Sequence, residues 1–580
     1  MIVAASKSTR GWSRRQFVQG LAAGGTWLGL AGPRTGWTLE TREHPGVLAG
    51  TDFQLTIGET AVNFTGRTRP AITVNGSLPA PILRWREGTT VNLSVRNALP
   101  AHSIHGAQTS LHWHGIQLPA NMDGIPGMSF NGIARGESWL YRFKVGQAGT
   151  YWYHSHSGLQ EQAGLYGALI IDPIAPEPFA FDRDYVVMLS DWTDLAPAAL
   201  LARLKKMPAH DNYYQPTVGD LIREARNDGL GAALAERRMW GRMRMNPSDL
   251  SDVNAHTYSY LMNGTTSLGN WTGLYRPHEK VRLRFINGSS MSYFDVRIPG
   301  LKMTVVAADG QYVHPVSVDE FRIAAAETFD VIVTPAGQEA FTLFAQDSAR
   351  TGYVSGTLAV RAGLRAPVPA LDPRPLLTMA DMGGMDMSMH HSDADTEHAQ
   401  HATAQSHPDS ERGNPLVDNQ ALRPMSRLAD PGNGLRGNGR TVLSYSMLKS
   451  TFEDPDGRDP GRDLEIHLTG HMEKFAWSFN GRKFSAAEPI HMCYGERLRI
   501  VLVNDTMMAH PIHLHGLWSD VEDDDGNFLV RKHTVDMPPG SRRSYRVRAD
   551  ALGHWAYHCH LLYHMEAGMM RAVHVMEHGS

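Results

Sequence analysis

Apolar and polar positions alternate along three short segments of the chain, and each segment follows an Asn-Gly pair and ends in an asparagine. Alternation with a period of two predicts a β-strand with one buried face, and Asn-Gly is a strong turn signal. The three units run from Asn75-Gly76 to Asn97, from Asn263-Gly264 to Asn287, and from Asn480-Gly481 to Asn504. Repetition at this scale predicts an all-β chain with three copies of one antiparallel β-sandwich domain.

Two stretches depart from this strand pattern. Between residues 195 and 240, apolar side chains such as Leu200, Leu201 and Leu204 recur at helical spacing, which predicts short helices inserted in the second domain. A later stretch is polar, rich in Pro and Gly and without periodicity, and is predicted to be a flexible linker. The predicted boundaries are 45–178 for domain 1, 179–365 for domain 2, 366–440 for the linker and 441–580 for domain 3.

The first 40 residues resemble an export signal. Arg14-Arg15 is followed by Phe17 and by a weakly apolar run, Leu21–Ala31, rich in Gly and Ala. This combination is typical of a twin-arginine signal peptide, and the run is shorter than the roughly 20 apolar residues of a membrane-spanning helix. We therefore expect the twin-arginine export machinery as a partner, a periplasmic location, and no membrane insertion of the mature chain.

Composition narrows the chemistry. The formal net charge of −4 gives no basic surface for nucleic acid, so we expect no nucleic-acid partner. The chain has 29 histidines and 27 methionines, both of which are copper-compatible ligands, but only two cysteines. Cys493 is interpreted as a small buried residue, whereas Cys559 lies between two histidines.

Four His-x-His pairs lie in the first and third repeats, at corresponding places, and none follows the strand of the second repeat. A strand puts both imidazoles of such a pair on one face, so four pairs predict a metal cluster where domains 1 and 3 meet. Copper suits eight imidazoles, and zinc, which is commonly four-coordinate, suits them poorly. The pairs are His112/His114, His154/His156, His513/His515 and His558/His560.

In His558-Cys559-His560 the histidines face one way along a strand and the cysteine faces the other. The tripeptide therefore joins two metal sites by a few covalent bonds, which suits the transfer of electrons between them. On the cysteine side, His510, His564 and Met569 have the spacing to complete the Cys, two-His and long axial Met set of blue-copper sites.

These motifs, His-x-His-Gly, His-x-His, His-Pro-x-His-x-His and His-Cys-His-x₃-His-x₄-Met, resemble the four copper signatures of the multicopper oxidases. Segments such as Met239–Met245 and Tyr260–Gly264 are similar to the bacterial copper-resistance protein A branch of that family. The resemblance implies three cupredoxin-like Greek-key domains and four copper ions. By the resemblance, type 1 copper takes His510, Cys559, His564 and Met569; type 2 takes His112 and His513; and the type 3 pair takes His114, His154 and His560, with His156, His515 and His558.

The resemblance also implies the reaction. A reducing substrate gives electrons one at a time to the type 1 site, and Cys559 passes them through its neighbouring histidines to the cluster, where O2 is reduced to water. Protons are then needed at the cluster. Asp123 matches the family's acid near the type 2 copper, although Asp-Gly is also a turn signal. Glu566, two residues after His564, is a candidate second acid.

The electron donor is predicted from methionines. Thioethers select Cu(I), and a polar stretch of the linker is rich in Met and His, which predicts copper capture. Met508 matches a residue that binds substrate copper in cuprous oxidases of the superfamily, with Asp505 as its acidic partner. We therefore expect Cu(I) as substrate; oxidation of phenols and copper sequestration remain as alternatives. The linker residues assigned to substrate copper are Met379, Met382, Met385, Met387, Met389, His390 and His391.

Overall fold

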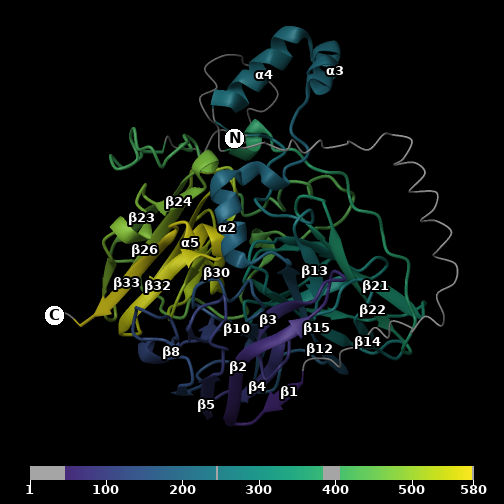
Figure 1. Cartoon of the computed structure of the whole chain (residues 1–580), viewed down its shortest axis with the longest axis vertical. Coiled ribbons are helices and arrows are strands. Elements are labelled where there is room, and N and C mark those ends of the chain that lie inside the picture. The colour runs from purple at the N-terminus through teal and green to yellow at the C-terminus, as the bar shows by residue number, and fades with distance from the viewer. Residues whose placement is uncertain (1–45, 243, 245, 383–404, 578–580) are drawn as a thin grey trace, which may run out of the picture. The chain divides into compact units, whose positions relative to one another are not determined.

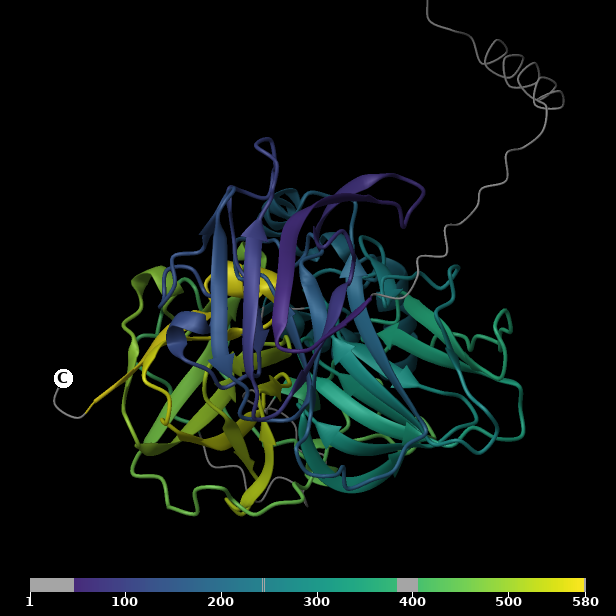
Figure 2. The same cartoon turned by 90° about the horizontal axis from the view of Figure 1, so that it is seen from below.

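The computed structural model describes residues 46–242, 244, 246–382 and 405–577 (Figure 1). These residues form three groups of strands, which Figure 2 separates by colour: purple and blue for domain 1, teal for domain 2, and green to yellow for domain 3. The predicted export signal lies outside the described residues. Among the described residues, no helix is long and apolar enough to cross a lipid bilayer.

Domain 1 packs a sheet of order β1-β4-β11-β10-β7 against one of order β3-β2-β5-β9. The alternating segment predicted from sequence is β5, where Val91, Leu93 and Val95 are fully buried. The elements of domain 1 are β1 (Val47–Ala49), β2 (Asp52–Val62), β3 (Arg69–Val74), β4 (Ala80–Arg86), β5 (Thr90–Asn97), β6 (Gln108–Thr109), β7 (His112–His114), η1 (Ala120–Met122), β8 (Ile133–Ala134), β9 (Ser138–Lys144), β10 (Gly149–His154) and β11 (Tyr166–Asp172).

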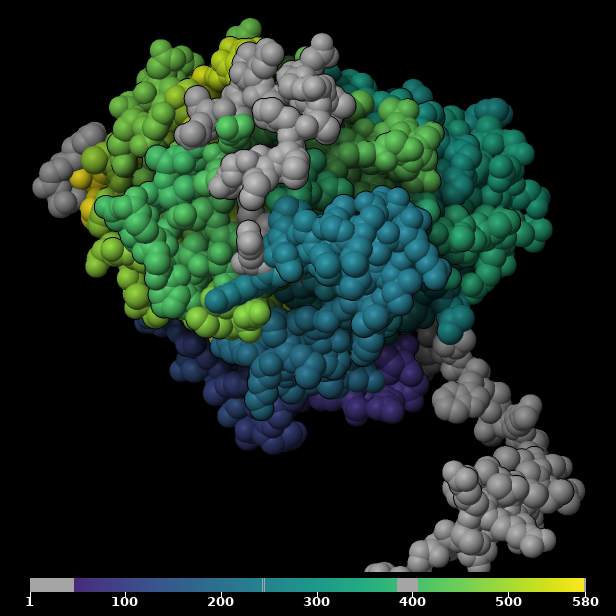
Figure 3. All heavy atoms as spheres, turned by 90° about the horizontal axis from the view of Figure 1, so that it is seen from above, coloured from purple at the N-terminus to yellow at the C-terminus, as the bar shows by residue number. Residues whose placement is uncertain are grey.

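Domain 2 has a sheet of order β13-β12-β15-β20-β17-β18 and another of order β14-β22-β21-β16-β19. The predicted helical insertion is present as α2, α3 and α4, and Figure 3 shows the face of the molecule that carries it. The elements are β12 (Arg183–Trp192), α2 (Pro197–Lys206), η2 (Pro208–Asp211), α3 (Val218–Asp228), α4 (Leu230–Arg242), β13 (Ser259–Met262), β14 (Thr272–Leu274), β15 (Val281–Asn287), β16 (Phe294–Arg297), β17 (Met303–Ala308), β18 (Gln311–Val318), β19 (Glu320–Ile323), β20 (Thr328–Val333), β21 (Ala340–Asp347) and β22 (Tyr353–Ala359).

Domain 3 repeats the arrangement with orders β24-β23-β26-β31-β28-β29 and β25-β33-β32-β27-β30. Two short helices, η3 (Met379–Met382) and η5 (Tyr445–Met447), precede it. Its elements are β23 (Asp463–His471), η6 (Met472–Lys474), β24 (Ala476–Phe479), η7 (Phe484–Ala486), β25 (Ile490–Cys493), β26 (Arg497–Asn504), β27 (His510–Leu514), β28 (Ser519–Glu522), β29 (Phe528–Lys532), β30 (Thr534–Met537), β31 (Arg542–Arg548), β32 (Gly553–Cys559), α5 (Leu562–Glu566) and β33 (Met570–Met576).

The sheets are mixed, whereas the sequence predicted antiparallel ones. In each domain the first long strand pairs in parallel with the strand of the alternating segment: β2 with β5, β12 with β15, and β23 with β26. Between the two members of each pair, the chain visits the other sheet through β4, β14 or β25. A crossover of this kind is what allows two strands of one sheet to run in the same direction.

The asparagines of the three repeats hold equivalent junctions. Asn75, Asn263 and Asn480 have φ values of 51–52°, a left-handed conformation that asparagine tolerates at turns. The asparagines that end β5, β15 and β26 are fully buried, and each amide donates hydrogen bonds to two or three backbone carbonyls of neighbouring strands and loops. Each repeat in the sequence therefore supplies one asparagine at a turn and one buried asparagine that fixes the neighbouring backbone by hydrogen bonds.

Replacing Asn287 by alanine tests this role in a domain without copper ligands. The change leaves the buried carbonyls of Ser292 and Ile323 without their donor. Because an unpaired buried polar group costs roughly 1–3 kcal/mol, we expect a destabilisation of about 3 kcal/mol. Thermal unfolding should show a clear fall in Tm, while Asn121→Ala, at an exposed position, should leave the Tm unchanged. Equal Tm values for the two variants would contradict the stabilising role of the Asn287 hydrogen bonds.

The segment predicted to be a flexible linker is in fact held by polar contacts in its described parts. Asp372 accepts hydrogen bonds from Arg297 and Gln346 of domain 2, and Ala421 donates its backbone N–H to Asp505 of domain 3. A segment held by charge pairs and backbone hydrogen bonds needs no periodic apolar residues. The pattern of apolar positions therefore could not reveal these contacts. Cys493 also differs from its interpretation, because it is exposed at the end of β25.

Candidate metal centres

Strand pairing brings the four His-x-His pairs together. In domain 1, His154 on β10 lies opposite His112 on β7, and in domain 3, His558 on β32 lies opposite His513 on β27. The rings of His114 and His513 stack across the domain boundary with centroids 3.8 Å apart. All eight imidazoles are buried apart from His156, which is partly exposed. Domains 1 and 3 therefore share one interior cluster of imidazoles.

The ring nitrogens converge in three sets whose atoms lie within 4.8 Å of one another. Two of these sets match the trios that the sequence assigned to the type 3 pair, and the third contains both residues assigned to type 2. The sets are His114, His154 and His560; His156, His515 and His558; and His112, His114 and His513.

Hydrogen bonds behind the rings show that this cluster fits metal ions. His515 donates from Nδ1 to Asp123 (3.0 Å) and His558 donates from Nδ1 to the carbonyl of Cys559 (2.9 Å). In the neutral tautomers their Nε2 lone pairs then face each other 2.9 Å apart. Two facing lone pairs repel unless a cation lies between them, and partners behind the rings orient metal-binding histidines in this way.

A second pair of histidines gives the same result. His112 and His513 donate from Nδ1 to the carbonyls of Asp123 and His533, at 2.9 and 2.6 Å. Their Nε2 atoms are buried without a hydrogen-bond partner. Burial lowers the pKa of His513 well below its ordinary value and that of His558 to about 4, so these rings stay neutral, which is the metal-binding form.

On the opposite face of β32, Cys559 forms a separate set with His510 and His564. The sulfur lies 3.6 and 3.9 Å from the two Nδ1 atoms, which are 3.1 Å apart. Behind them, Thr506 bonds His510 Nε2 and Asp252 bonds His564 Nε2, both at 2.7 Å. Burial raises the pKa of the Cys559 thiol, so a bound cation is needed to hold it as thiolate.

Met569, assigned as the axial ligand, lies next to this set. Its carbonyl accepts from the N–H of Cys559, its N–H donates to the carbonyl of His564, and its side chain is fully buried. Soft sulfur together with two imidazoles is a donor set that suits copper. The structure thus places the two predicted centres on opposite faces of the His-Cys-His strand.

Two buried carboxylates touch the imidazole cluster. Asp123 lies 3.2 Å from His112 Nδ1 and 3.0 Å from His515 Nδ1, as the sequence analysis expected. Glu161 lies 2.7 Å from His154 Nδ1, and burial raises its pKa well above the ordinary value. Glu161 was not predicted from the sequence, although an acid five residues after His156, in the loop that follows a ligand pair, is a usable signal.

The structure does not bring Glu566, the predicted second acid, into contact with the imidazole cluster. It lies at the end of α5, beside the type 1 ligand His564, and its side chain is exposed. The helix turns this side chain away from the interior, so its closeness in sequence to His564 does not bring it to the cluster. Glu161 contacts a ligand of the cluster and Glu566 does not, so Glu161 is the better candidate for the second acid.

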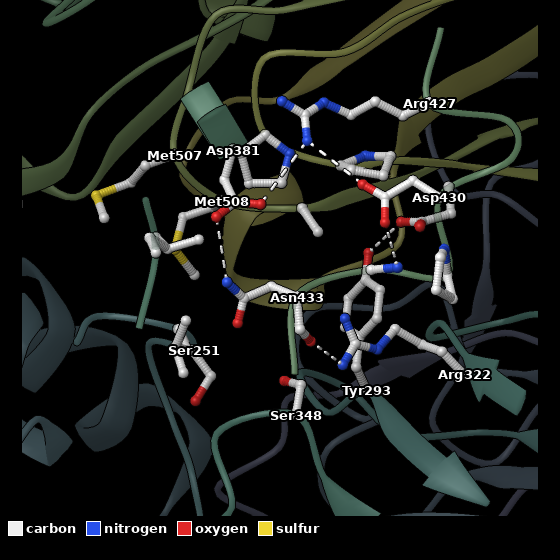
Figure 4. A pocket seen from close by; sticks show the side chains of 18 of the residues that line it. Ser251, Tyr293, Arg322, Ser348, Asp381, Arg427, Asp430, Asn433, Met507 and Met508 are labelled. Atoms are coloured by element: carbon white, nitrogen blue, oxygen red, sulfur yellow. Dashed lines mark hydrogen bonds and ion pairs between the residues drawn. The ribbon is translucent and has the colours of Figure 1, made fainter. Parts of the chain in front are cut away.

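A pocket of about 120 Å³ lies against the Cys559 centre (Figure 4). Asp252, which bonds His564, lines it, as do Met507 and Met508. In Figure 4 the two methionines lie on the same side of the pocket, across from Tyr293 and Arg322. Met508 therefore lies in the wall of a pocket beside this centre, and its role in binding substrate copper stays a prediction.

The other residues assigned to substrate copper have different surroundings. Asp505 contacts His467 at 2.7 Å and does not line the pocket that Met508 lines, so the structure gives no support to its predicted partnership with Met508. Met382 is buried in the hydrophobic core and Met379 packs partly against it. Met385, Met387, Met389, His390 and His391 lie outside the described residues.

Comparisons with known proteins agree with this architecture. Models of the multicopper oxidase family match residues 56–176, 183–362 and 457–579. Copper resistance protein A of Escherichia coli is 60% identical, over 97% of this chain and 99% of that protein, and copper resistance protein A of Pseudomonas syringae pv. tomato is 58% identical over the same shares.

Among solved structures, a multicopper oxidase from Pseudomonas thermotolerans aligns with a TM-score of 0.57 at 20% identity. The alignment covers 91% of this chain and all of that one, so it supports the fold. The three matched domains, the relatives that span nearly the whole chain and the two metal-binding centres lead to one conclusion: the chain belongs to the multicopper oxidase family, in the copper resistance protein A branch, with one type 1, one type 2 and a type 3 pair of copper ions.

Proposed function

We propose that this enzyme oxidises Cu(I) to Cu(II) in the periplasm, after export by the twin-arginine route, and so protects the cell against copper. Two relatives that span nearly the whole chain carry the name copper resistance protein A. Family membership makes O2 the electron acceptor and a reducing substrate the donor. Family membership leaves the identity of the donor open, and we propose that the donor is Cu(I).

The pocket beside the Cys559 centre is the observation that carries the proposal. Met507 and Met508 are both buried and line it, and thioethers favour Cu(I) over harder cations. The volume of about 120 Å³ is below the roughly 300–1,000 Å³ of pockets that enclose drug-sized ligands, so the pocket suits a small donor. Asp252 joins the pocket wall to His564 through one hydrogen bond.

The residues act at two sites: the Cys559 centre, where the donor gives up electrons (the donor end), and the imidazole cluster, where O2 is reduced (the oxygen end). At the donor end, the methionines bind the reducing ion, and Asp252 and Thr506 fix the rings of His564 and His510. At the oxygen end, Asp123 contacts His515 and Glu161 contacts His154, and these contacts support a role for both acids in holding and delivering protons. The bound coppers supply one-electron redox chemistry, and Cys559 lies between His558 and His560 as the shortest covalent connection between the ends.

Met508→Gln tests the donor assignment. The change keeps the length of the side chain and removes the soft sulfur, so we expect the KM for Cu(I) to rise about tenfold, the effect of losing roughly 1.4 kcal/mol of binding. O2 uptake with a phenol should be unchanged. Met425→Gln, at a residue with 39% exposure, is the matched control. If Met508→Gln lowers phenol oxidation and leaves Cu(I) oxidation intact, the enzyme is a laccase-like oxidase instead.

The Met/His-rich stretch is tested by deleting residues 383–404, because His407 and Met382 on either side of it are packed against the rest of the chain. If the stretch captures copper, the deletion should raise the KM for Cu(I) several-fold and leave kcat unchanged, as measured by O2 uptake. Unchanged Cu(I) kinetics would remove the capture role and leave the oxidase assignment standing. Stoichiometric copper binding without turnover, in the intact protein, would instead identify a sequestering protein.

A further inference from the structure

A second cluster of metal-ligand residues lies in domain 3, outside the copper centres. It contains His407 and Glu411 from the segment before domain 3, His467 from β23, and Asp505, the residue after β26. Their donor atoms all lie within 4.8 Å of one another. Glu411, His467 and Asp505 are at most 2% exposed. Four potential ligands from three distant parts of the chain therefore meet at one buried point.

The individual distances show where the donors point. Asp505 Oδ2 lies 2.7 Å from His467 Nδ1 and 3.6 Å from His407 Nδ1. Glu411 Oε2 lies 3.2 Å from His407 Nδ1, and Oε1 lies 3.6 Å from His467 Nδ1. Glu411 Oε1 is buried and accepts no hydrogen bond. An unpartnered carboxylate oxygen is thus aimed at the same point as both Nδ1 atoms.

Groups behind the cluster fix the direction of each donor. His407 Nε2 donates to the carbonyl of Ala421 (3.1 Å), and His467 Nε2 donates to Glu465 (3.2 Å). Both partners are acceptors, so each Nε2 carries a hydrogen and each Nδ1 faces the carboxylates. Burial alone would lower the pKa of His467, but Asp505 and Glu411 raise it to about 9, so without a metal its Nδ1 also carries a proton, which a bound cation would displace. The same arrangement of an acceptor behind each imidazole occurs at the copper centres of this chain.

The carboxylates are held in the same way. The N–H of Ala421 donates to Asp505 Oδ1 (2.8 Å), and Gln420 donates to Glu411 Oε2 (3.2 Å). These bonds leave Asp505 Oδ2 facing inward, where it contacts His467 Nδ1, and Glu411 Oε1 without a hydrogen-bond partner. Four acceptors converging in a buried place repel one another, so the geometry requires a cation or protons among them.

We infer that His407, Glu411, His467 and Asp505 bind one divalent cation, Cu(II) or Zn(II). Two carboxylates and two neutral imidazoles balance a charge of two. Imidazole nitrogen with carboxylate oxygen suits Cu(II) and Zn(II), and the absence of sulfur among these four ligands disfavours Cu(I). His407, the most exposed of the four at 10% of its side chain, gives a route of entry from solvent.

The cation would tie the segment that follows residues 383–404 to domain 3. Asp505 also precedes Thr506, which bonds the type 1 ligand His510. The proposed cation site is therefore connected to the type 1 site through the consecutive residues Asp505 and Thr506. The inference does not depend on which donor the enzyme oxidises, so it can fail or stand separately from the proposed function.

The test uses the full chain with its four coppers in place. Crystals soaked in ZnCl2, and separately in CuCl2, are measured at the zinc and copper absorption edges. We expect an anomalous peak among the four side chains, and the two soaks tell which metal the site takes. No peak in either soak would overturn the inference and leave a buried hydrogen-bonded network only.

Solution measurements on variants complete the test. The copper-loaded enzyme is equilibrated with Zn(II) or Cu(II), desalted and analysed for metal content. His407→Gln and Glu411→Gln should each retain one metal ion fewer than the wild type, whereas His314→Gln, at an exposed position on β18, should retain the wild-type amount. Blue absorption at the wild-type intensity shows that the variants are folded; equal metal content in such folded variants would also overturn the inference.

Discussion

Cys559→Ser is expected to abolish oxidation of every donor, because the change removes the thiolate that completes the type 1 site. Its sulfur lies 3.6 and 3.9 Å from the two imidazole nitrogens of that site. A serine hydroxyl is a weak ligand for copper and stays protonated at neutral pH. Removing a group behind a metal ligand costs roughly 10–100-fold in affinity or activity, and removing the ligand itself should cost more.

Metal analysis and the blue absorption measure this effect separately from activity. The variant should contain one copper ion fewer than the wild type and lose the blue colour, while the imidazole cluster keeps its metal. Cys493→Ser is the matched control, because Cys493, the other cysteine of the chain, is exposed and lies outside both centres. If Cys559→Ser keeps its colour and oxidises Cu(I) at the wild-type rate, the assignment of the donor end is wrong.

Asp123→Asn is expected to lower kcat by roughly 10²–10⁴-fold, the usual contribution of a general acid or base. The asparagine has the same shape and can still accept a hydrogen bond from His515, so the cluster should keep its copper. What the amide cannot do is release and take up protons between His112 and His515. The expected defect is therefore in turnover, with the KM for the donor unchanged.

O2 uptake under saturating donor, together with copper analysis, measures this prediction. Glu566→Gln should behave like the wild type, since the Glu566 side chain is exposed at the end of α5 and makes no described contact with the imidazole cluster. Glu161→Gln should resemble Asp123→Asn, because Glu161 contacts His154. Wild-type kcat in Asp123→Asn would show that the residue serves only the turn in which it lies.

The ligands of both centres could be predicted from sequence because they follow strand geometry. In a strand, residues separated by two share a face, so each His-x-His pair and the His-Cys-His tripeptide specify directions without knowledge of the fold. The internal repeat then placed the pairs in domains 1 and 3. The structure adds the pairing of His112 with His154 and of His513 with His558, which makes one cluster of the four pairs.

Apart from Asp123, the groups behind the ligands could not be predicted, because long-range folding brings them into place. Asp252 lies in the loop after the helical insertion and reaches His564, more than 300 residues later in the chain. Glu161 sits in a loop with no strand period. Asp505 follows a strand end, where a change of one residue alters the side on which a carboxylate points, and it joined His467 instead of Met508.

The most direct test of the proposed enzyme is the amount of O2 consumed while Cu(I) is oxidised. An oxygen electrode, combined with assays for Cu(II) and hydrogen peroxide, measures all three quantities in one reaction. We predict one O2 for every four Cu(I) oxidised, without hydrogen peroxide and over many turnovers for each enzyme molecule. Uptake that stops when each protein molecule has bound its complement of copper would contradict the account.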